Sequence, residues 1–495
     1  MSSGEPVQVN LRLRSFAAEL TLPPGTRVLR RSEPAPLTNV EEAVRRALAE
    51  PIGTLPFAEL CRAKLEQYAS RGHRGVPGQE GSDKASGTRA GSRDTSGPQV
   101  VVVVSDNTRP VPYRGEGNIL WPLVSALLEA GFPGSSITLL VATGMHRVLT
   151  DEEMWSMFDD RVREAGVRVA CHDALDREGL VSVGKTARGV EVFMDRRYVA
   201  ADFRILTGLV EPHAHAGASG GRKSLCPGLV DVRSLQEFHG ARTLAHERAT
   251  DLILDGNPCH EAALDVARMA PPDFILNVTA RVDGQVAGVF AGDMEKAHLA
   301  AFEHLLSFAG IPLDQRYDVV VTHAGLVGIN FYQSEKAASA AARAARPQGY
   351  IVVVADTVDA NPVGTLSYRR LLSMLVEVGR EEFLRRIMAD DWEFQHDQWG
   401  VQGWSKFLAK IPRDHLFFYG PQMPLDEYPQ LICRDPRPIL EGLEVSDPGV
   451  TVAHFVSAAV AQACRLSEAE TGRPASVAYL ADGPYGIPLA EEGTA

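Results

Sequence analysis

The 495-residue chain is poor in cysteine and has no excess of positive charge. Its six cysteines are scattered without any C-x-x-C pair, which argues against a zinc ribbon or a disulfide framework and predicts reduced, cytoplasmic thiols. The formal net charge of −13 argues against nucleic-acid binding, because a binding face must be basic to replace the counterions of the phosphates. We therefore expect a cytoplasmic protein that does not bind nucleic acid.

Long apolar runs are missing as well. No uninterrupted apolar run approaches the roughly 20 residues that a membrane-spanning helix needs. The first residues, Met-Ser-Ser-Gly-Glu-Pro, lack the basic start and apolar core of a secretion signal. With 45% hydrophobic and 23% charged residues, the chain has the composition of a globular protein of roughly two to four domains. No membrane partner is expected.

Two common nucleotide-binding motifs are absent. No G-x-G-x-x-G follows any predicted strand, which argues against a plain NAD-dependent oxidoreductase. Gly217, Lys223 and Ser224 fit the phosphate-binding pattern G-x-x-x-x-G-K-[ST], but Arg222 occupies the position of its second glycine. Lys223 must therefore serve a purpose other than that of the lysine in nucleotide hydrolases.

Three short apolar runs, at 100–104, 137–141 and 203–210, are each followed directly by polar residues. Wholly apolar runs of this length are typical of parallel strands that are covered on both faces. Open α/β sheets bind their ligands at the carboxyl ends of such strands. The three polar segments therefore predict one shared site.

The order of the elements predicts an α/β fold of two domains with Rossmann-like open sheets and an active site in the cleft between them. We place an N-terminal domain at 1–310 and a C-terminal domain at 311–495. A segment rich in Gly, Ser, Arg and Asp at 70–98 is expected to be a mobile surface insertion. Further predicted elements are a hairpin within 1–30 with its turn at 23–26, a hairpin at 274–290, helices at 38–48, 119–130, 335–345, 368–388 and 403–410, and strands at 317–322, 350–354 and 477–480.

The stretch Glu211–Val230 holds the densest group of reactive side chains. His213 and His215 could form half of a zinc site, but no third ligand follows at a familiar spacing. Taken singly, most histidines and lysines are structural or solvated, so each of these residues also has an ordinary interpretation. Their joint order and spacing are what favour a functional one.

That order resembles the nickel-dependent lactate racemase family, whose members carry a nickel-pincer nucleotide (a pyridinium-3,5-bisthiocarboxylic acid mononucleotide with nickel). In the family, a lysine in a Ser-Gly-Gly-Arg-Lys segment holds this cofactor covalently, which implies Lys223 here. A histidine 16 residues later binds the metal, which implies His239. A catalytic histidine ten residues before the lysine implies His213 instead of His215.

Other motifs extend the resemblance from about residue 106 to about residue 402. Asp106-Asn-Thr-Arg-Pro110 is similar to a D-x-T-R-P segment of the family, and Thr143-Gly-Met-His-Arg147 to its second catalytic-histidine motif. Tyr332-Gln-Ser-Glu-Lys336 resembles the segment that binds the substrate carboxylate, and Asp397-Gln-Trp399 a late block near the site. The implied roles are catalysis for His146 and His213; cofactor binding for Lys223, Asp106, Ser219, Gly220 and Gly221; substrate binding for Arg109, Gln333, Lys336, Tyr332 and Trp399; and metal binding for His239.

The implied reaction is inversion at C2 of a 2-hydroxy acid such as lactate or malate, by transient hydride transfer to the cofactor. The hydroxyl proton must leave with the hydride, and inversion needs one proton acceptor on each side, a task suited to two histidines. The implied partners are a small-molecule substrate and cofactor-maturation enzymes, and the oligomeric state is open. Two alternatives are a C2-epimerase of sugar (aldonic) acids with the same cofactor and a non-catalytic family member that lacks nickel.

Overall fold

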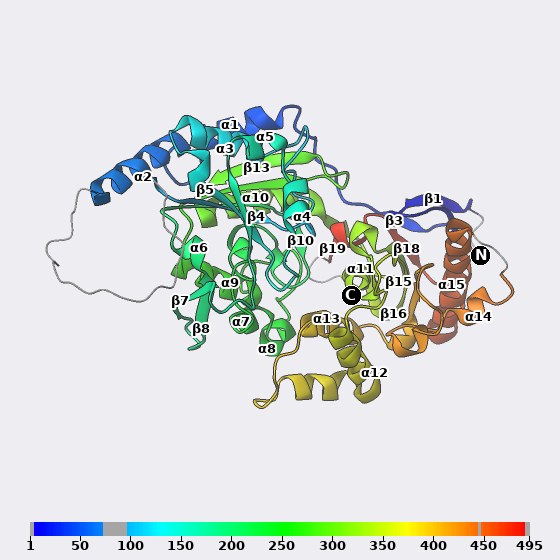
Figure 1. Ribbon diagram of the computed structural model, residues 1–495. Helices are drawn as coiled ribbons and strands as arrows, with labels where there is room; N and C mark the ends of the chain where they lie inside the picture. The colour runs from blue at the N-terminus through cyan, green and yellow to red at the C-terminus, as the bar shows by residue number, and fades with distance from the viewer. Residues whose placement is uncertain (1–3, 73–96, 444–446, 491–495) are drawn as a thin grey trace.

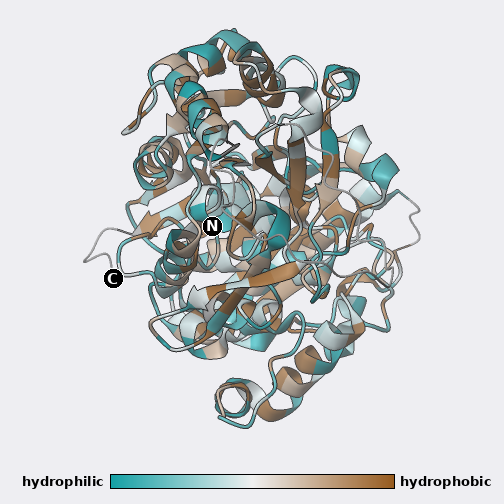
Figure 2. Cartoon of the chain, turned by 60° about the vertical axis from the view of Figure 1, so that its left-hand side comes forward, coloured by the Kyte–Doolittle hydropathy of each residue, from teal (hydrophilic) through white to brown (hydrophobic). Residues whose placement is uncertain are grey.

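The computed structural model describes residues 4–72, 97–443 and 447–490. Two α/β units lie side by side in Figure 1, one drawn mainly in cyan and green and the other mainly in yellow to red. Each unit is built on a mostly or wholly parallel sheet. In Figure 2 the strands of these sheets are largely brown, whereas many outer helices carry teal faces, as expected for buried sheets.

The first sheet has six strands in the order β13-β12-β9-β4-β5-β6. Its strands are β4 (Val100–Ser105), β5 (Ile137–Ala142), β6 (Arg168–Cys171), β9 (Phe203–Leu209), β12 (Phe274–Ala280) and β13 (Val286–Gly292). Only β12 and β13 pair antiparallel. The valines of β4 are almost fully buried, alternately against two separate hydrophobic clusters, because helices cover both faces of the sheet. The three apolar runs are confirmed as neighbouring strands.

Helices from distant parts of the chain cover this sheet. One face packs against α1 (Val40–Ala49), α2 (Phe57–Gly72) and α3 (Leu120–Glu129). The other face packs against α7 (Leu235–His239), α9 (Pro258–Met269) and α10 (Met294–Ala309). Shorter elements of this unit are α4 (Asp151–Ser156), α5 (Asp160–Glu164), β7 (Leu180–Lys185), β8 (Glu191–Asp195), α6 (Arg196–Val199), β10 (Pro212–His213), β11 (Gly217–Ala218) and α8 (Ala241–Ala245).

The second sheet has five parallel strands in the order β17-β16-β15-β18-β3. They are β3 (Arg27–Leu29), β15 (Tyr317–His323), β16 (Ala345–Val354), β17 (Leu416–Tyr419) and β18 (Val477–Leu480). Figure 1 shows α11 and α15 on opposite sides of β15. The helices of this unit are α11 (Phe331–Ala344), α12 (Leu366–Ile387), α13 (Gln398–Leu408), α14 (Arg437–Leu440) and α15 (Pro448–Thr471). A short parallel pair, β14 (Gly310–Leu313) with β19 (Ile487–Ala490), lies beside them.

The N-terminal hairpin differs from its prediction. It consists of β1 (Val7–Arg12) and β2 (Ala17–Leu22), so the hairpin turns at residues 13–16. The predicted turn at 23–26 is present but does not join the strands of the hairpin. The turn at 23–26 instead leads into β3, which pairs with β18 in the second sheet. The hairpin also packs against α15. Residues 7–29 thus belong to the second unit, which corrects the single cut near 310 that we placed between the domains.

Local capping explains where α11 begins. The Asn330 side chain accepts the N–H of Gln333, so the helix begins at Phe331, four residues before the predicted start. Both Gln333 and Lys336 consequently lie in its first two turns. Of the predicted insertion at 70–98, residues 70–72 complete α2 and residues 97–98 lead into β4, while 73–96 lie outside the described residues.

One described helix, α15, is long and apolar enough to cross a membrane by length and composition alone. Its buried residues, among them Phe455, Val456 and Val460, belong to the hydrophobic cluster of the second sheet. The helix contacts β2, β15 and β16 along its length. Its apolar face is therefore the face that packs on the sheet.

Candidate functional site

The side chains singled out in the sequence come from the two units and gather where the units meet. Loops after β4, β5 and β9 and the last residue of α7 supply those of the first unit, and the starts of α11 and α13 supply those of the second. The rings of His239 and Trp399 stack across this boundary with centroids 4.9 Å apart. Close by, the Gln402 side chain donates to the carbonyl of Ala241 at 2.6 Å. The site is therefore formed only when both units are in contact.

His146 and Asp106 form a hydrogen-bonded pair. Nδ1 of His146 lies 2.6 Å from Oδ2 of Asp106, and Thr108 donates its hydroxyl to the same carboxylate at 2.7 Å. Burial alone would raise the pKa of Asp106, but the hydrogen bonds from His146 and Thr108 outweigh it and lower that pKa. We assign the proton to Nδ1, since an ionised carboxylate can only accept. The other ring nitrogen, Nε2, is then free to exchange protons with a ligand.

His213 lies beside Lys223, with Nε2 of the ring 3.2 Å from Nζ of the lysine. Its Nδ1 accepts the backbone N–H groups of His215 and Ala216, each at 3.2 Å. Burial, followed by nearby cationic side chains such as Arg109, holds the pKa of His213 well below its usual value. The ring is therefore neutral at pH 7.

The surroundings of Lys223 also disfavour the protonated form of its amine. Burial, followed by the nearby Arg109 and Arg222, lowers its pKa well below the usual value. No carboxylate pairs with it within the described residues, and its Nζ lies 4.4 Å from the ring centroid of Phe238. A neutral amine has a free electron pair, so Lys223 has the properties of a nucleophile.

Two cations and an amide face the same region. Arg109 forms an ion pair through Nη1 with Oε1 of Glu211, a residue that the sequence analysis did not assign to the site. Gln333 and Lys336 make no side-chain hydrogen bond within the described residues, so their donors are available to a ligand. Burial, then the charge of Arg109, lowers the pKa of Lys336 to about 8. In the sequence, the only signal for a role of Glu211 was its place in the run of polar residues that follows β9.

His239 is buried, with 8% of its surface exposed, and its Nδ1 has no hydrogen-bond partner. Burial lowers its pKa well below the usual value, so the imidazole is neutral. The indole of Trp399 stacks on it with 15° between the ring planes, and donates its N–H to the hydroxyl of Tyr332 at 2.5 Å. Trp399 and Tyr332, predicted to bind substrate, thus contact each other and orient the predicted metal ligand.

The glycine-rich turn contains Ser219, Gly220 and Gly221, which the resemblance assigned to cofactor binding. The hydroxyl of Ser219 donates to the carbonyl of Leu209 at 2.7 Å, and the amide of Gly221 donates to Oδ1 of Asn277 at 2.9 Å. Both donors are therefore used inside the protein. Gly220 and Gly221 have φ values of +75° and +52°, and a Cβ at either position would come within 3 Å of a neighbouring side chain. The glycines permit close packing of the turn against β12 and α10.

Arg222, the residue that breaks the nucleotide-hydrolase pattern, is buried beneath this turn with 1% of its surface exposed. Its guanidinium donates to the carbonyls of Ala216 at 2.9 Å and Ala218 at 3.1 Å. It also donates at 2.8 Å to the imidazole of His298 on α10, whose pKa is held low by burial and by Arg222. A second glycine could not provide these contacts.

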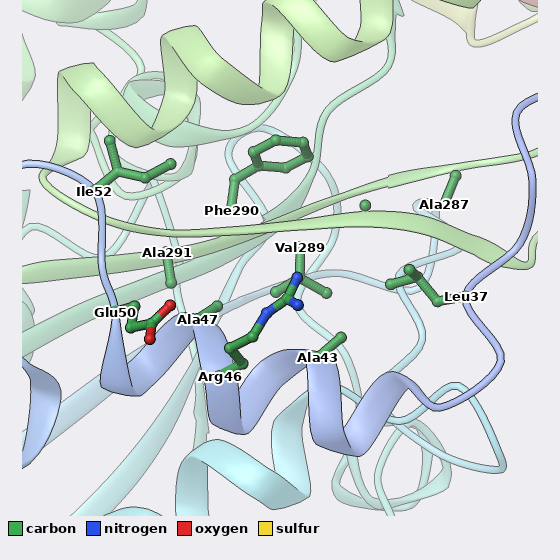
Figure 3. Close-up of a pocket in the computed structure, with 11 residues that line it drawn as sticks. Leu37, Ala43, Arg46, Ala47, Glu50, Ile52, Ala287, Val289, Phe290 and Ala291 are labelled. Atoms are coloured by element: carbon green, nitrogen blue, oxygen red, sulfur yellow. The ribbon is translucent and has the colours of Figure 1, made fainter.

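Two cavities lie outside this group of residues. One, of about 450 Å³, is formed between α1 and the edge strand β13, and contains none of the predicted site residues (Figure 3). The other, of about 170 Å³, lies between the units and is lined by His215, Asp251 and Glu335 among others. No three His, Cys, Asp or Glu side chains within the described ranges converge on a point that could hold a metal ion. The zinc interpretation of His213 and His215 therefore lacks a third ligand.

Comparison with known proteins gives a consistent family. Residues 90–251 match the family model described as the lactate racemase N-terminal domain. A lactate racemase of Thermoanaerobacterium thermosaccharolyticum is 29% identical over 366 residues, 72% of this chain and 76% of that protein. A second, of Lactiplantibacillus plantarum, is 29% identical over 339 residues, 68% of this chain and 76% of that protein. The chain belongs to the lactate racemase family.

Solved structures show the same fold. The lactate racemase apoprotein of T. thermosaccharolyticum superposes with a TM-score of 0.76 at 23% identity, covering 98% of this chain and all of that one. A Thermotoga maritima protein superposes with a TM-score of 0.56 at 17% identity, covering 80% and 94% of the two chains. The mixed α/β architecture with parallel sheets is thus that of the lactate racemase family, whose members are isomerases.

The matched segment bears directly on the site. It contains the six first-unit residues at the centre of the site, namely Asp106, Arg109, His146, His213, Lys223 and His239. Gln333, Lys336 and Trp399 lie beyond residue 251. Within this family member, the second unit therefore contributes its side chains from outside the segment that defines the N-terminal domain.

Replacing Arg222 with methionine should destabilise the first unit by about 3 kcal/mol, because the buried Ala218 carbonyl and the imidazole of His298 would lose the guanidinium as donor, and the Ala216 carbonyl would keep only the N–H of Ala218. Urea unfolding should show a lower free energy of unfolding, and amide hydrogen exchange should accelerate at residues 216–221. Arg268→Met, which removes an exposed ion pair with Glu295, is the control and should cost at most about 0.5 kcal/mol. If Arg222→Met lowered the free energy of unfolding by less than about 1 kcal/mol, the stabilising role of the Arg222 hydrogen bonds would be contradicted.

Proposed function

We propose that the chain inverts the configuration at C2 of a 2-hydroxy acid, with a nickel-pincer nucleotide attached at Lys223 and with His146 and His213 as the two acid/base groups. When bound, the cofactor would accept the C2 hydrogen as hydride and return it. The observation that carries the proposal is the convergence of three groups within the described residues. They are the Lys223 amine, which pairs with no carboxylate, the adjoining His213 ring, and the His239 ring, whose Nδ1 has no hydrogen-bond partner.

The side chains at the site fit this cofactor. Covalent attachment requires an amine that is not protonated, and the lowered pKa of Lys223 supplies one. A metal that is held mainly by an organic group needs few protein ligands, and His239 offers a single neutral imidazole without a competing hydrogen bond. Trp399 stacks on this ring and would fix its plane. The Ser219 hydroxyl and the Gly221 amide do not support phosphate binding, since both donate within the protein.

Two histidines with different surroundings would handle the hydroxyl proton. His146 presents Nε2 while Asp106 holds Nδ1, an arrangement that fixes the tautomer and stabilises the protonated ring. His213 presents Nε2, since two backbone amides occupy the side of its Nδ1. One ring would take the proton as the hydride leaves, and the other would return a proton when the hydride comes back to the opposite face.

The substrate carboxylate would bind to Arg109, Lys336 and Gln333. Arg109 can bind it through two parallel hydrogen bonds, whereas Lys336 acts as a point charge and Gln333 as a neutral donor. The availability of Gln333 and Lys336 supports this role, because both side chains are only half-buried and their donors make no side-chain hydrogen bond within the described residues. Cations from both units would then hold the carboxylate while the oxidised substrate rotates to present its other face.

We also propose that the chain acts in the cytoplasm and receives its cofactor from maturation enzymes. The cysteines at positions 61, 171, 259, 433 and 464 are free thiols, which supports a reducing compartment. In this reaction the substrate would be a small molecule, and neither nucleic acid nor a membrane would take part.

Lys223→Ala should abolish covalent loading, because the only proposed attachment atom is removed. The test is intact mass with peptide mapping, on protein produced together with the cofactor's biosynthetic enzymes and nickel. The wild-type peptide around Lys223 should carry a mononucleotide-sized adduct, and the variant should carry none. Lys185→Ala, at an exposed position on β7, is the control and should load normally. An unmodified wild-type Lys223 under these conditions would refute the proposed attachment.

His146→Ala and His213→Ala should each lower kcat by roughly 10²- to 10⁴-fold in both directions, because each ring serves as base one way and acid the other. The assay follows both enantiomers of a 2-hydroxy acid from either starting material, with circular dichroism to check the fold. His454→Ala, on the exposed side of α15, should retain full activity. A normal rate in either catalytic variant would sink the two-base scheme.

Substrate capture should weaken as pH rises through about 8. Lys336 has a pKa lowered to about 8, so its ammonium is present below that pH and lost above it. The kcat/KM for a 2-hydroxy acid should therefore fall above pH 8 by up to tenfold per unit. In Lys336→Met this decline should disappear, at a lower and flatter kcat/KM. A decline that persists unchanged in Lys336→Met would assign it to another group.

A further inference from the structure

We propose that Glu211 sets the net charge of the carboxylate site, so that the site selects monocarboxylic over dicarboxylic 2-hydroxy acids. The inference rests on the proposed function, which places a substrate carboxylate on Arg109 and Lys336. Glu211 is not one of the residues that the resemblance implied. Its carboxylate forms an ion pair with Arg109 and lies within electrostatic range of Lys336, whose ammonium it stabilises.

The position of Glu211 is fixed by its backbone. Its N–H donates to the Ser219 hydroxyl at 3.0 Å, and its carbonyl accepts the Ser219 N–H at 3.0 Å. The Ser219 hydroxyl in turn donates to Leu209, the last residue of β9. This explains why Ser219 is turned inward instead of toward a phosphate. The side chain, 18% exposed, is thereby held at the end of the strand.

The contact with Arg109 leaves most of the guanidinium unused. A guanidinium has five N–H donors, and within the described residues only Nη1 of Arg109 makes a side-chain hydrogen bond, to Glu211. An edge of the guanidinium therefore stays available for a second carboxylate. Glu211 orients Arg109 without occupying it, so Glu211 is a positioning residue and a source of charge.

The charges around the site can be counted. Arg109 and Lys336 contribute two positive charges, and Glu211 and Asp106 contribute two negative charges, with Asp106 also within electrostatic range of Arg109. The lowered pKa values of Lys223 and His213 disfavour a positive charge on either group. One substrate carboxylate would therefore make the sum of these charges negative. A second carboxylate would enter a site that is already negative and already contains Glu211, so it would be repelled.

Glu211→Gln tests this directly, because the amide keeps the size of the side chain and an oxygen acceptor for Arg109 but removes the charge. The cofactor-loaded protein is assayed with lactate and with malate, which differ by one carboxylate. We expect the ratio of kcat/KM for malate to that for lactate to rise at least about tenfold. Glu211→Asp keeps the charge and should keep the preference for lactate. Glu295→Gln removes an exposed ion pair with Arg268 and should leave the ratio unchanged.

Binding to the cofactor-free protein provides a readout that does not depend on turnover. Calorimetric dissociation constants for lactate and malate should show the same shift of preference in Glu211→Gln. If the loaded wild type inverts neither acid but the binding preference shifts as expected, the proposed function fails and the role of Glu211 stands. The inference would be overturned if the wild type preferred malate, or if Glu211→Gln lowered the affinity for both acids equally. It would also be overturned if the cofactor-free protein bound neither acid and the ratio of kcat/KM values did not change in Glu211→Gln.

Discussion

The turn that carries Lys223 is held from behind by a buried guanidinium. Arg222 bonds to the carbonyls of Ala216 and Ala218 and to His298, while the next residue, Lys223, contacts His213. The Arg222 side chain thereby anchors this short segment to the core, and the next side chain, Lys223, carries the reactive amine. A charged group this deeply buried is tolerated only because carbonyl oxygens and an imidazole accept its hydrogen bonds. Every proposed role of His213 and Lys223 depends on this turn staying fixed.

The contact between the two units is the second constraint. Trp399 stacks on His239, and its N–H bonds to Tyr332 on α11, so the second unit orients a ring of the first. The same helix carries Lys336 toward Arg109 and Glu211. Separating the units would remove at once the orientation of the predicted metal ligand and one of the two cations. The site thus depends on the contact between the two units.

Much of the fold could be predicted because burial leaves a pattern in the sequence. The run of valines at 100–104 has no polar face, so only a strand covered on both sides could accommodate it, and β4 is such a strand. Strand pairing was harder to predict, since alternation shows that a segment is extended but not which strand lies beside it. For this reason β3 was missed as a strand of the second sheet, and the N-terminal turn was placed ten residues too late.

The site shows the same division. Spacing and resemblance singled out the histidines and Lys223, which the fold brings together, because those residue types are informative by themselves. Which way a hydroxyl or an amide points is decided by three-dimensional neighbours, so the inward bonds of Ser219 and Gly221 left no signal in the sequence. Glu211 was overlooked for a related reason: an acid beside a predicted carboxylate-binding arginine looks unfavourable until their contact is seen to leave that arginine mostly free.

These arrangements together couple base strength to the presence of substrate. In the empty site, burial and the charges of Arg109 and Lys336 keep the pKa of His213 low, so the ring is a weak base. A carboxylate bound to Arg109 and Lys336 would partly offset those charges and raise the basicity of His213. In the proposed reaction, His213 would therefore become a more effective base only after the substrate is in place.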